Sequence, residues 1–434
     1  MSGDRQFKPE TLAIHAGQIP DEATGARALP IYQTTSFVFD SADHAASLFN
    51  LQTFGNVYSR LSNPTVAALE ERVAALEGGR AAVASASGMA AEAMALMTIL
   101  QQGDHVVAAG ALYGGTVTML AVNLAKFGIQ TTFVDATRPD AFAAAMRPNT
   151  RAVFAESLGN PSLVVLDIPA VAEVAHAHGV PLLIDNTVPS PFLCNPLALG
   201  ADIVVHSATK YLAGHGTTLG GVLVESGRFP WDNGKFPGMT DPSPGYHGVK
   251  FFETFGDFGF SMRARMETLR VYGAALAPLA AWQILQGVET LPLRMERHCR
   301  NARAVAEFLR ADKRVGWVNY PGLEDHPQHA LLARQVRLID GLPGASGLLA
   351  FGVQGGIDAG VRFIEAAKFM SHLANIGDTR TLIIHPASTT HRQLDEAQAR
   401  AAGVTPDMVR ISVGLEHIDD ILWDVDQALA AASA

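Results

Sequence analysis

The sequence predicts an α/β fold, with a mostly parallel central sheet in a large domain and a smaller α+β domain at the C-terminus. Three observations support this prediction. Short apolar runs alternate with helical patterns between Arg80 and about Glu225, which is typical of a parallel sheet with helices on both faces. Three further apolar runs after about residue 286 predict the strands of a second unit. The chain has 434 residues, which is too long for one ordinary core.

The first predicted segment, residues 1–61, mixes Pro, Gly, Thr and aromatic residues without a clear period. This composition indicates an arm or a loop-rich lobe rather than a separate core. The large domain is expected to span residues 62–285. Its predicted strands cover residues 81–84, 105–108, 131–134, 151–154, 181–184, 202–205 and 221–224.

An interruption rich in aromatic residues, Gly and Pro covers residues 227–260. It is too long for a plain connection, and such segments are more often functional. A long helical pattern then runs from about residue 260 to 309. The smaller domain is expected to span residues 286–434, with strands at 348–351, 381–384 and 408–413.

Composition argues against two broad classes of function. The net charge is −10, only 17% of the residues are charged, and no basic run appears, whereas binding to nucleic acid or to a membrane surface needs clustered Lys and Arg. No apolar stretch is long enough to span a bilayer, and residues 1–10 lack the pattern of a signal peptide, so a cytoplasmic protein is expected. Cys194 and Cys299 are too few for a disulfide framework and are expected to be buried thiols.

The most informative stretch is residues 201–210, a buried strand that ends in hydroxyls and is followed by Lys210. Ligands of open α/β sheets gather at the carboxyl ends of such strands. Lys210 is therefore expected in the ligand crevice, where partial desolvation would favour its neutral amine and let it condense with an aldehyde. A surface lysine is the alternative when the residue is considered alone.

A phosphate site is predicted beside this lysine. Residues 85–91 leave a strand and open a helix, with Ser87 before Gly88, and free N–H groups at a helix N-terminus bind phosphate. Ser207 and Thr209 would add hydroxyls to the same anion. An ordinary helix capped by Ser87 is the alternative.

Three other strand ends bring side chains to this edge. Asp185 could pair with a ring nitrogen and keep it protonated, or it could be only a turn or helix cap. The ring of Tyr113 could stack on a flat cofactor or pack in the core. The amide of Asn160 could reach a ring substituent, although Asn-Pro is also a turn signal. Together, a lysine, an acid, an aromatic ring and a phosphate cradle in one crevice predict pyridoxal 5′-phosphate (PLP) as the cofactor.

The sequence resembles the cysteine and methionine metabolism family of fold type I PLP-dependent enzymes, which have the aspartate aminotransferase-like fold, over nearly the whole chain. In this family a segment similar to residues 58–65 carries a Tyr and an Arg to the cofactor phosphate of a neighbouring subunit. The resemblance therefore implies that role for Tyr58 and Arg60, and an arm that contacts that subunit. It also implies a catalytic dimer, usually paired into a homotetramer.

The resemblance assigns further roles by position. Lys210 would carry the cofactor, and Tyr113 would stack on its ring and assist proton transfer. Arg410, within residues 409–416, matches the family arginine that holds the substrate carboxylate, a task that suits its guanidinium fork; alone, it could be a surface ion-pair partner. Thr381 is a second expected substrate contact. The expected cofactor-binding residues are Tyr58, Arg60, Ser87, Gly88, Met89, Tyr113, Asn160, Asp185, Thr187, Ser207, Thr209 and Lys210, and no metal site is expected.

Within the family, residues 376–391 and the stretch through residues 246–248 are most similar to the O-acetylhomoserine sulfhydrylases. This implies γ-replacement of O-acetyl-L-homoserine by sulfide or methanethiol, giving homocysteine or methionine. Two alternatives stay open: a cystathionine γ-synthase or γ-lyase, and a methionine γ-lyase, although the latter usually has a cysteine where this chain has Gly115. A catalytically silent binding protein with this fold is the alternative from another class.

Overall fold

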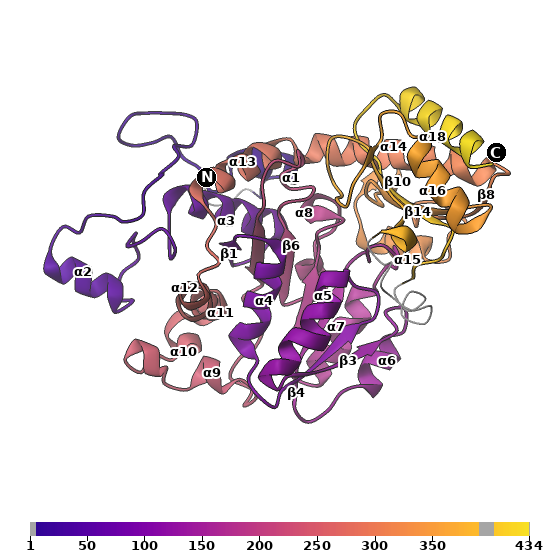
Figure 1. Ribbon diagram of the computed structural model, residues 1–434. Helices are drawn as coiled ribbons and strands as arrows, with labels where there is room; N and C mark the ends of the chain where they lie inside the picture. The colour runs from indigo at the N-terminus through magenta and orange to yellow at the C-terminus, as the bar shows by residue number, and fades with distance from the viewer. Residues whose placement is uncertain (1–5, 390–402, 434) are drawn as a thin grey trace.

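The computed structural model describes residues 6–389 and 403–433, which fold around two main sheets (Figure 1). The sheet of the large domain has seven strands in the order β1-β7-β6-β5-β4-β2-β3. Strands β2 to β6 pair in parallel, whereas β7 is antiparallel to both of its neighbours. The strands are β1 Ala81–Ser85, β2 His105–Ala109, β3 Gln130–Val134, β4 Thr150–Glu156, β5 Leu182–Asp185, β6 Ile203–Ser207 and β7 Gly221–Glu225. All seven predicted strands are present, and the predicted fold class is confirmed.

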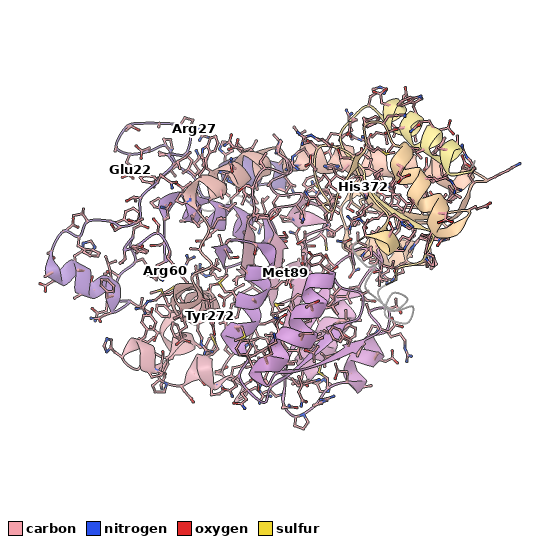
Figure 2. All side chains as sticks on the ribbon, in the orientation of Figure 1. Glu22, Arg27, Arg60, Met89, Tyr272 and His372 are labelled. Atoms are coloured by element: carbon pink, nitrogen blue, oxygen red, sulfur yellow. The ribbon has the colours of Figure 1, made fainter. Side chains whose placement is uncertain are left out.

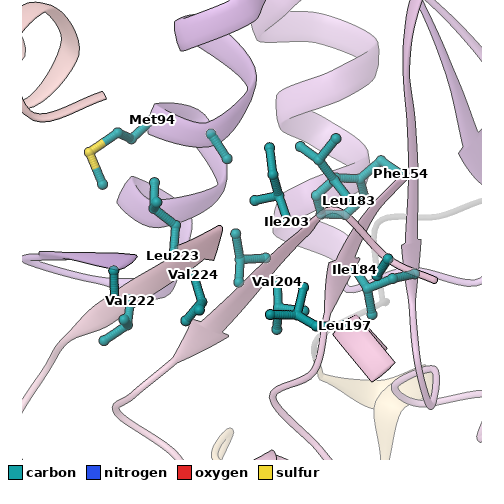
Figure 3. Close-up of a cluster of buried hydrophobic side chains, with 14 of the residues drawn as sticks. Met94, Phe154, Leu183, Ile184, Leu197, Ile203, Val204, Val222, Leu223 and Val224 are labelled. Carbon is teal, nitrogen blue, oxygen red and sulfur yellow. The ribbon is translucent and has the colours of Figure 1, made fainter. Parts of the chain in front are cut away.

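Helices cover both faces of this sheet, as the apolar character of its strands requires. Among them are α3 (Pro64–Glu77), α4 (Gly88–Ile99) and α7 (Ile168–Ala177). Successive strand residues point to opposite faces. Figure 3 shows Leu223 on the side of Met94 from α4, with Val222 and Val224 on the other side. The three strand residues are fully buried, so both faces of the sheet contribute to the core.

The sheet of the smaller domain has five strands in the order β12-β13-β14-β11-β8. The three strands expected from the sequence are present, whereas β8 and β12 were not predicted. The strands are β8 Val315–Asn319, β11 Leu348–Val353, β12 Ser371–His372, β13 Leu382–Ile384 and β14 Met408–Ser412. Helices α14 (Leu291–Ala311) and α16 (Gly356–Ala366) pack against this sheet, and α18 (Ile418–Ala432) packs against these two helices.

The prediction of one continuous helical segment over residues 260–309 was wrong. The segment divides into α11 (Gly259–Arg263), a π-helical stretch (Ala264–Leu269), α12 (Arg270–Tyr272), α13 (Pro278–Glu289) and α14. Gly273 ends the first part with a φ of 77°, in the left-handed region that glycine adopts without strain. Pro278 then begins α13, where its missing N–H costs nothing.

The N-terminal segment contains two short helices, α1 (Pro9–His15) and α2 (Ala42–Phe49). The part of the chain around α2 extends away from the rest of the molecule at the left of Figure 1. The beginning of the N-terminal segment, at α1, is held by Arg72 of α3, which is fully buried. The Arg72 guanidinium donates to the carbonyl oxygens of Ala13 and Ala16, and it pairs with Glu289 of α13.

Two buried clusters correspond to the two sheets. The larger cluster surrounds the seven-stranded sheet and the smaller one surrounds β11 and β14. Helix α14 joins them, since Met295 and Cys299 lie in the first cluster and Ala302 and Val305 in the second. The boundaries at residues 61/62 and 285/286 stay a proposal, and the latter falls inside α13.

The aromatic interruption at residues 227–260 forms a packed cluster next to the large sheet. The rings of Trp231 and Phe260 stack at 5.4 Å, and Phe229 and Phe236 meet Trp231 edge-on. The cysteines are buried free thiols, as expected. In residues 6–389 and 403–433, no helix is both long and apolar enough to cross a membrane.

Candidate active site

The site lies at the edge of the large sheet where its parallel strands end. Asp185 is the last residue of β5 and Ser207 the last of β6. Gly221 begins the antiparallel β7 and lies beside both Ser207 and Ser85. Strands β5, β6 and β7 thus bring two polar side chains and a glycine to the same edge of the sheet. This is where an open α/β sheet is expected to bind its ligand.

The N-terminus of α4 lies directly against β6 and β7 at this edge. A side chain at Gly88 would place its Cβ 2.6 Å from Cβ of Ser207, and one at Gly221 would lie 2.0 Å from the carbonyl oxygen of Ser87. Only glycine fits at either position. Ser87 caps α4 by accepting from the N–H of Ala90 at 3.1 Å, so the helix dipole and its free N–H groups face Ser207. This geometry suits an anion.

Lys210 follows in the turn after β6 and is mostly removed from solvent. Burial, with the nearby charge of Arg410 as the second cause, lowers the pKa of Lys210 to about 8. Its Nζ donates to Oδ1 of Asn375, at 2.5 Å. A lysine with this pKa has a substantial neutral fraction near neutrality, which is the form that condenses with an aldehyde.

Asp185 is one of three buried acids at this edge. Its Oδ1 accepts from the N–H of Thr187 at 2.7 Å. Glu156, the last residue of β4, accepts from the N–H groups of Tyr113 (2.6 Å) and Asn160 (3.0 Å). Glu92 of α4 accepts from the hydroxyl of Thr116 at 2.8 Å. Burial, and then the charge of Asp185, raises the pKa of Glu92 and of Glu156 well above the usual value.

Arg410 lies on β14 of the smaller domain and reaches across to the large one. Its guanidinium donates to Oδ1 of Asn160 (2.9 Å) and to the carbonyl oxygen of Asn375 (3.0 Å). Its buried Nε has no hydrogen-bond partner in the described part of the chain. Burial lowers the pKa of Arg410 to about 10. A cation with an unused donor, next to Lys210, suits a substrate carboxylate.

Tyr113 stands at the entrance with half of its surface exposed. A side chain at Gly115 would place its Cβ 2.6 Å from the Tyr113 ring and 3.2 Å from Sδ of Met89. Tyr113 and Met89 therefore both lie close to Gly115, which belongs to α5 (Gly114–Thr118). Met89 is labelled near the centre of Figure 2.

The threonines predicted for the site are already engaged by the protein. Thr187 accepts from the N–H of Ser207 at 2.8 Å and so ties β5 to β6. The Thr209 hydroxyl exchanges two hydrogen bonds with Gly220. Thr381 is fully buried, donates to the Glu416 carboxylate and accepts from the N–H of Gly414. Thr381 thus holds the segment that leads to the site, and a direct substrate contact of its hydroxyl stays an untested prediction.

Tyr58 and Arg60 lie apart from the strand-end residues, on the N-terminal segment. Both are exposed, and the Arg60 guanidinium lies 5.5 Å above the centre of the Tyr58 ring. Figure 2 labels Arg60 on this segment. The similarity to residues 376–391 includes Thr390 and His391, which lie outside the described residues.

Sequence reasoning gave no role to Glu92, Glu156 or Asn375. Glu92 had a usable signal, because it is the one charged residue in the apolar helix 88–99. Glu156 follows the strand predicted at residues 151–154, much as Asp185 follows the one predicted at 181–184, and each ends the observed strand. Asn375 had no local signal, since its partner Lys210 is 165 residues away in the sequence.

PLP has three groups that this edge could hold. Its aldehyde would meet the amine of Lys210, its phosphate the α4 N-terminus beside Ser207, and its ring nitrogen the carboxylate of Asp185. The lowered pKa of Lys210, the glycine-only approach at Gly88 and the buried Asp185 fit these groups. Fold and site together define a PLP-dependent enzyme of fold type I.

Comparison with known proteins specifies the family. The chain belongs to the Cys/Met metabolism PLP-dependent enzymes, whose family model matches residues 10–430. It is 54% identical to the O-acetyl-L-homoserine sulfhydrylase of Leptospira meyeri, over 98% of this chain and 97% of that protein. It is 50% identical to O-acetyl-L-homoserine sulfhydrylase 1 of Thermus thermophilus, over 97% and 99%.

A solved structure supports the same assignment. The crystal structure of a putative O-acetylhomoserine (thiol)-lyase from Campylobacter jejuni superposes with a TM-score of 0.94 at 40% identity, covering 98% of this chain and 100% of that one. That structure contains a lysine modified as N′-pyridoxyl-lysine-5′-monophosphate. The cofactor and fold predicted from the sequence are thus confirmed.

Proposed function

We propose that this chain replaces the acetate of O-acetyl-L-homoserine by sulfide, giving L-homocysteine and acetate. The observation that carries the proposal is the identity of 54% and 50%, over nearly the full length, to two enzymes named O-acetyl-L-homoserine sulfhydrylase. Methanethiol, which would give L-methionine, is the second proposed nucleophile. In the overall reaction the Cγ–O bond breaks with its electron pair leaving on acetate, and hydrosulfide forms the new C–S bond at Cγ.

The proposed roles of the protein groups follow from their positions. PLP, when bound, supplies an electron sink for the carbon from which a proton is removed. Nζ of Lys210, released from the cofactor by the substrate amine, takes the proton from Cα and moves protons at Cβ. Its pKa of about 8 suits both directions of transfer near neutrality. Tyr113, half exposed above Gly115, covers the cofactor ring and is a second group for proton transfer.

Arg410 is proposed to hold the substrate carboxylate. Its guanidinium is fixed by Asn160 and Asn375 on one side, while its Nε is left without a partner among the described residues. A carboxylate there would place the amino acid beside Lys210, because Asn375 contacts both cations. The side-chain oxygen of Asn160 accepts from Arg410. A contact of Asn160 with the cofactor ring is also proposed.

The cofactor phosphate is proposed to lie at the α4 N-terminus, held by Ser87, Gly88, Met89, Ser207 and Thr209, with Asp185 and Thr187 at the ring. Tyr58 and Arg60 would complete the phosphate site of a neighbouring subunit, within a homotetramer of catalytic dimers. The exposed apolar side chains of the N-terminal segment support this assembly: Val38 is 96% exposed and Phe54 is 75% exposed. We also propose that the protein acts in the cytoplasm, on small molecules.

The test is a comparison of donors and nucleophiles with the purified holoenzyme. O-acetyl-L-homoserine and O-succinyl-L-homoserine are each offered with sulfide, methanethiol and cysteine, and the products are identified. Homocysteine formation should be fastest with the acetyl donor and sulfide. L-methionine is also offered alone. Cystathionine as the main product with cysteine, or release of a keto acid from methionine, would assign the chain to one of the two alternative activities instead.

A further inference from the structure

Arg265 is a largely buried cation that the proposed reaction does not use. It lies in the π-helical stretch Ala264–Leu269, which packs against α4 and β1. Its guanidinium donates to the carbonyl oxygen of Leu61 at 2.8 Å, to Oε2 of Glu70 at 2.7 Å and to the carbonyl oxygen of Ala82 at 3.2 Å. π-Helical turns occur frequently at functional sites, and the planar fork of an arginine suits a junction of several acceptors.

Two of these contacts lie on the free side of β1, the outermost strand of the large sheet. Oε1 of Glu70 accepts from the N–H of Ala84 at 2.8 Å, while Arg265 donates to Ala82. The Arg265–Glu70 pair therefore satisfies backbone groups that a neighbouring strand would otherwise meet. All five residues of β1 also pair with β7 on the other side, so the path of β1 toward Ser87 does not depend on Arg265 alone.

The remaining contact of Arg265 holds the turn that carries Tyr58 and Arg60. Leu61 follows directly after Arg60. Its N–H donates to the carbonyl oxygen of Tyr58 at 2.8 Å, and its own carbonyl oxygen accepts from Arg265, which is 204 residues further along the chain. The end of this turn is thus tied to the body of the large domain by a charged donor.

The beginning of the same turn is held by neutral groups at Ser59. Its N–H donates to the carbonyl oxygen of Thr35 and its hydroxyl to that of Thr34, and both acceptors belong to the N-terminal segment itself. The hydroxyl also accepts from the amide of Asn63, the N-cap of α3, at 3.0 Å. Hydrogen bonds from a charged donor are roughly twice as strong as neutral ones. Of the two attachments to the large domain, the one from Arg265 is therefore the stronger.

We propose that Arg265 is a positioning residue for Tyr58 and Arg60, which fixes the turn that carries them and thereby shapes the cofactor phosphate site of the neighbouring subunit. The side chains of Tyr58 and Arg60 are exposed in the single chain, so the backbone of the turn sets where they meet the phosphate. The inference rests on the proposed role of these two residues across the subunit interface. It does not depend on which donor or nucleophile the enzyme uses.

The first test compares Arg265→Met with Arg263→Met as holoenzymes. Each protein is diluted into cofactor-free buffer, and the loss of the visible absorbance of the lysine-bound cofactor is followed. Arg265→Met should lose PLP faster, on the order of ten-fold, with unchanged far-ultraviolet circular dichroism. Arg263 is the matched control, because its side chain is 19% exposed against 18% for Arg265 and pairs with Glu267 instead of the turn. Arg263→Met should lose PLP at the wild-type rate.

Hybrid enzymes show in which subunit Arg265 acts. Differently tagged chains are coexpressed and purified through both tags, in two mixtures: Arg265→Met with Lys210→Ala, and the wild type with a chain that carries both substitutions. The absorbance reports only sites that keep Lys210. In the first mixture such a site can receive an intact turn from its neighbour, so a slow, wild-type-like phase of PLP loss should appear. In the second mixture it can receive the altered turn, so a fast phase should appear.

The opposite pattern would overturn the proposal. Only fast loss in the first mixture and only slow loss in the second would mean that Arg265 acts on β1 and the phosphate cradle of its own subunit. Unchanged PLP loss in Arg265→Met would overturn it as well. If Arg265→Met fails to fold, Arg265→Lys is used in the same mixtures, because lysine keeps the charge beside Glu70 but lacks the fork that also reaches Leu61.

The same mixtures with Arg60→Ala in place of Arg265→Met distinguish two kinds of failure. An own-subunit pattern for Arg60→Ala would mean that the proposed role of the turn is wrong, and the inference about Arg265 would fall with it. A neighbouring-subunit pattern for Arg60→Ala but not for Arg265→Met would leave that role in place and remove only the inference. A wrong substrate assignment affects neither readout, since no donor is added.

Discussion

The two edges of the large sheet both contain buried acids, and the acids differ in how they are satisfied. At the edge where the parallel strands begin, Asp202 accepts from the N–H of Leu182 and from His176, and Glu225 accepts from the N–H groups of Phe260 and Ser261. At the other edge, Glu92 accepts from a single hydroxyl, that of Thr116, and its pKa is raised by burial and then by the charge of Asp185. Buried acids that accept from backbone N–H groups tie separate segments of the fold together, whereas a buried acid close to another negative charge needs a proton or a ligand. The unmatched groups mark the reactive edge.

The largest expected effect comes from Lys210→Ala at the reactive edge. Removing the amine should lower turnover by a factor on the order of 10³ or more, and the visible absorbance of the lysine-bound cofactor should disappear. Steady-state homocysteine formation and an absorbance spectrum measure both. Lys235 is the matched control, since burial also lowers its pKa but its Nζ donates to the carbonyl of His178, near the opposite edge. Lys235→Ala should keep full activity. Full activity in Lys210→Ala would show that the edge with Lys210 is not the reactive one.

Arg410→Ala should have the next largest effect. Loss of the guanidinium fork should lower kcat/KM for the amino-acid donor on the order of 100-fold, while PLP content falls far less. Kinetics at varied donor concentration and a cofactor assay test this. Arg300, whose exposed guanidinium pairs with Asp340, supplies a control substitution without expected effect. Equal losses of donor binding and of PLP would make Arg410 a structural residue.

Asn375→Ala should have a smaller effect. The substitution removes the oxygen that accepts from Nζ of Lys210 but leaves the backbone carbonyl that accepts from Arg410. We expect kcat to fall on the order of ten-fold with little change in KM for the donor. A change in KM alone would show that Asn375 serves Arg410 rather than Lys210.

Glu225→Gln should leave activity unchanged and alter only the pH dependence of stability. Burial raises the pKa of Glu225 from 4.5 to about 7, so the folded state binds the proton more tightly than the unfolded state. The stability it contributes is complete below about pH 4.5 and is lost as the pH rises to about 7, which amounts to roughly 3 kcal/mol. Thermal midpoints between pH 4.5 and 8 should therefore fall less in the variant. Parallel curves for both proteins would contradict the raised pKa.

The strands of the large sheet could be predicted because burial on both faces imposes continuous apolar runs, as in residues 202–205 and 221–224. The places of Asp185, Ser207 and Lys210 follow from the strands, since Asp185 ends β5, Ser207 ends β6, and Lys210 lies in the turn that follows β6. The break at Gly273 had a readable signal, since a glycine followed five residues later by Pro278 is typical of a helix end and a new helix start. The prediction of one long helix missed it, because the apolar residues on both sides keep a helical pattern. The meeting of Asn375 with Lys210 could not be predicted, because it depends on the packing of one domain on the other.

The buried Arg72 has a consequence for synthesis of the chain on the ribosome. Its carbonyl partners, Ala13 and Ala16, precede it in the chain, whereas Glu289 follows 217 residues later. At a translation rate of about 5–20 residues per second, the anion emerges roughly 10–40 s after the guanidinium. The neutral carbonyls of the first helix can thus cover the cation early, and α3 can acquire its N-terminal partner long before α13 exists.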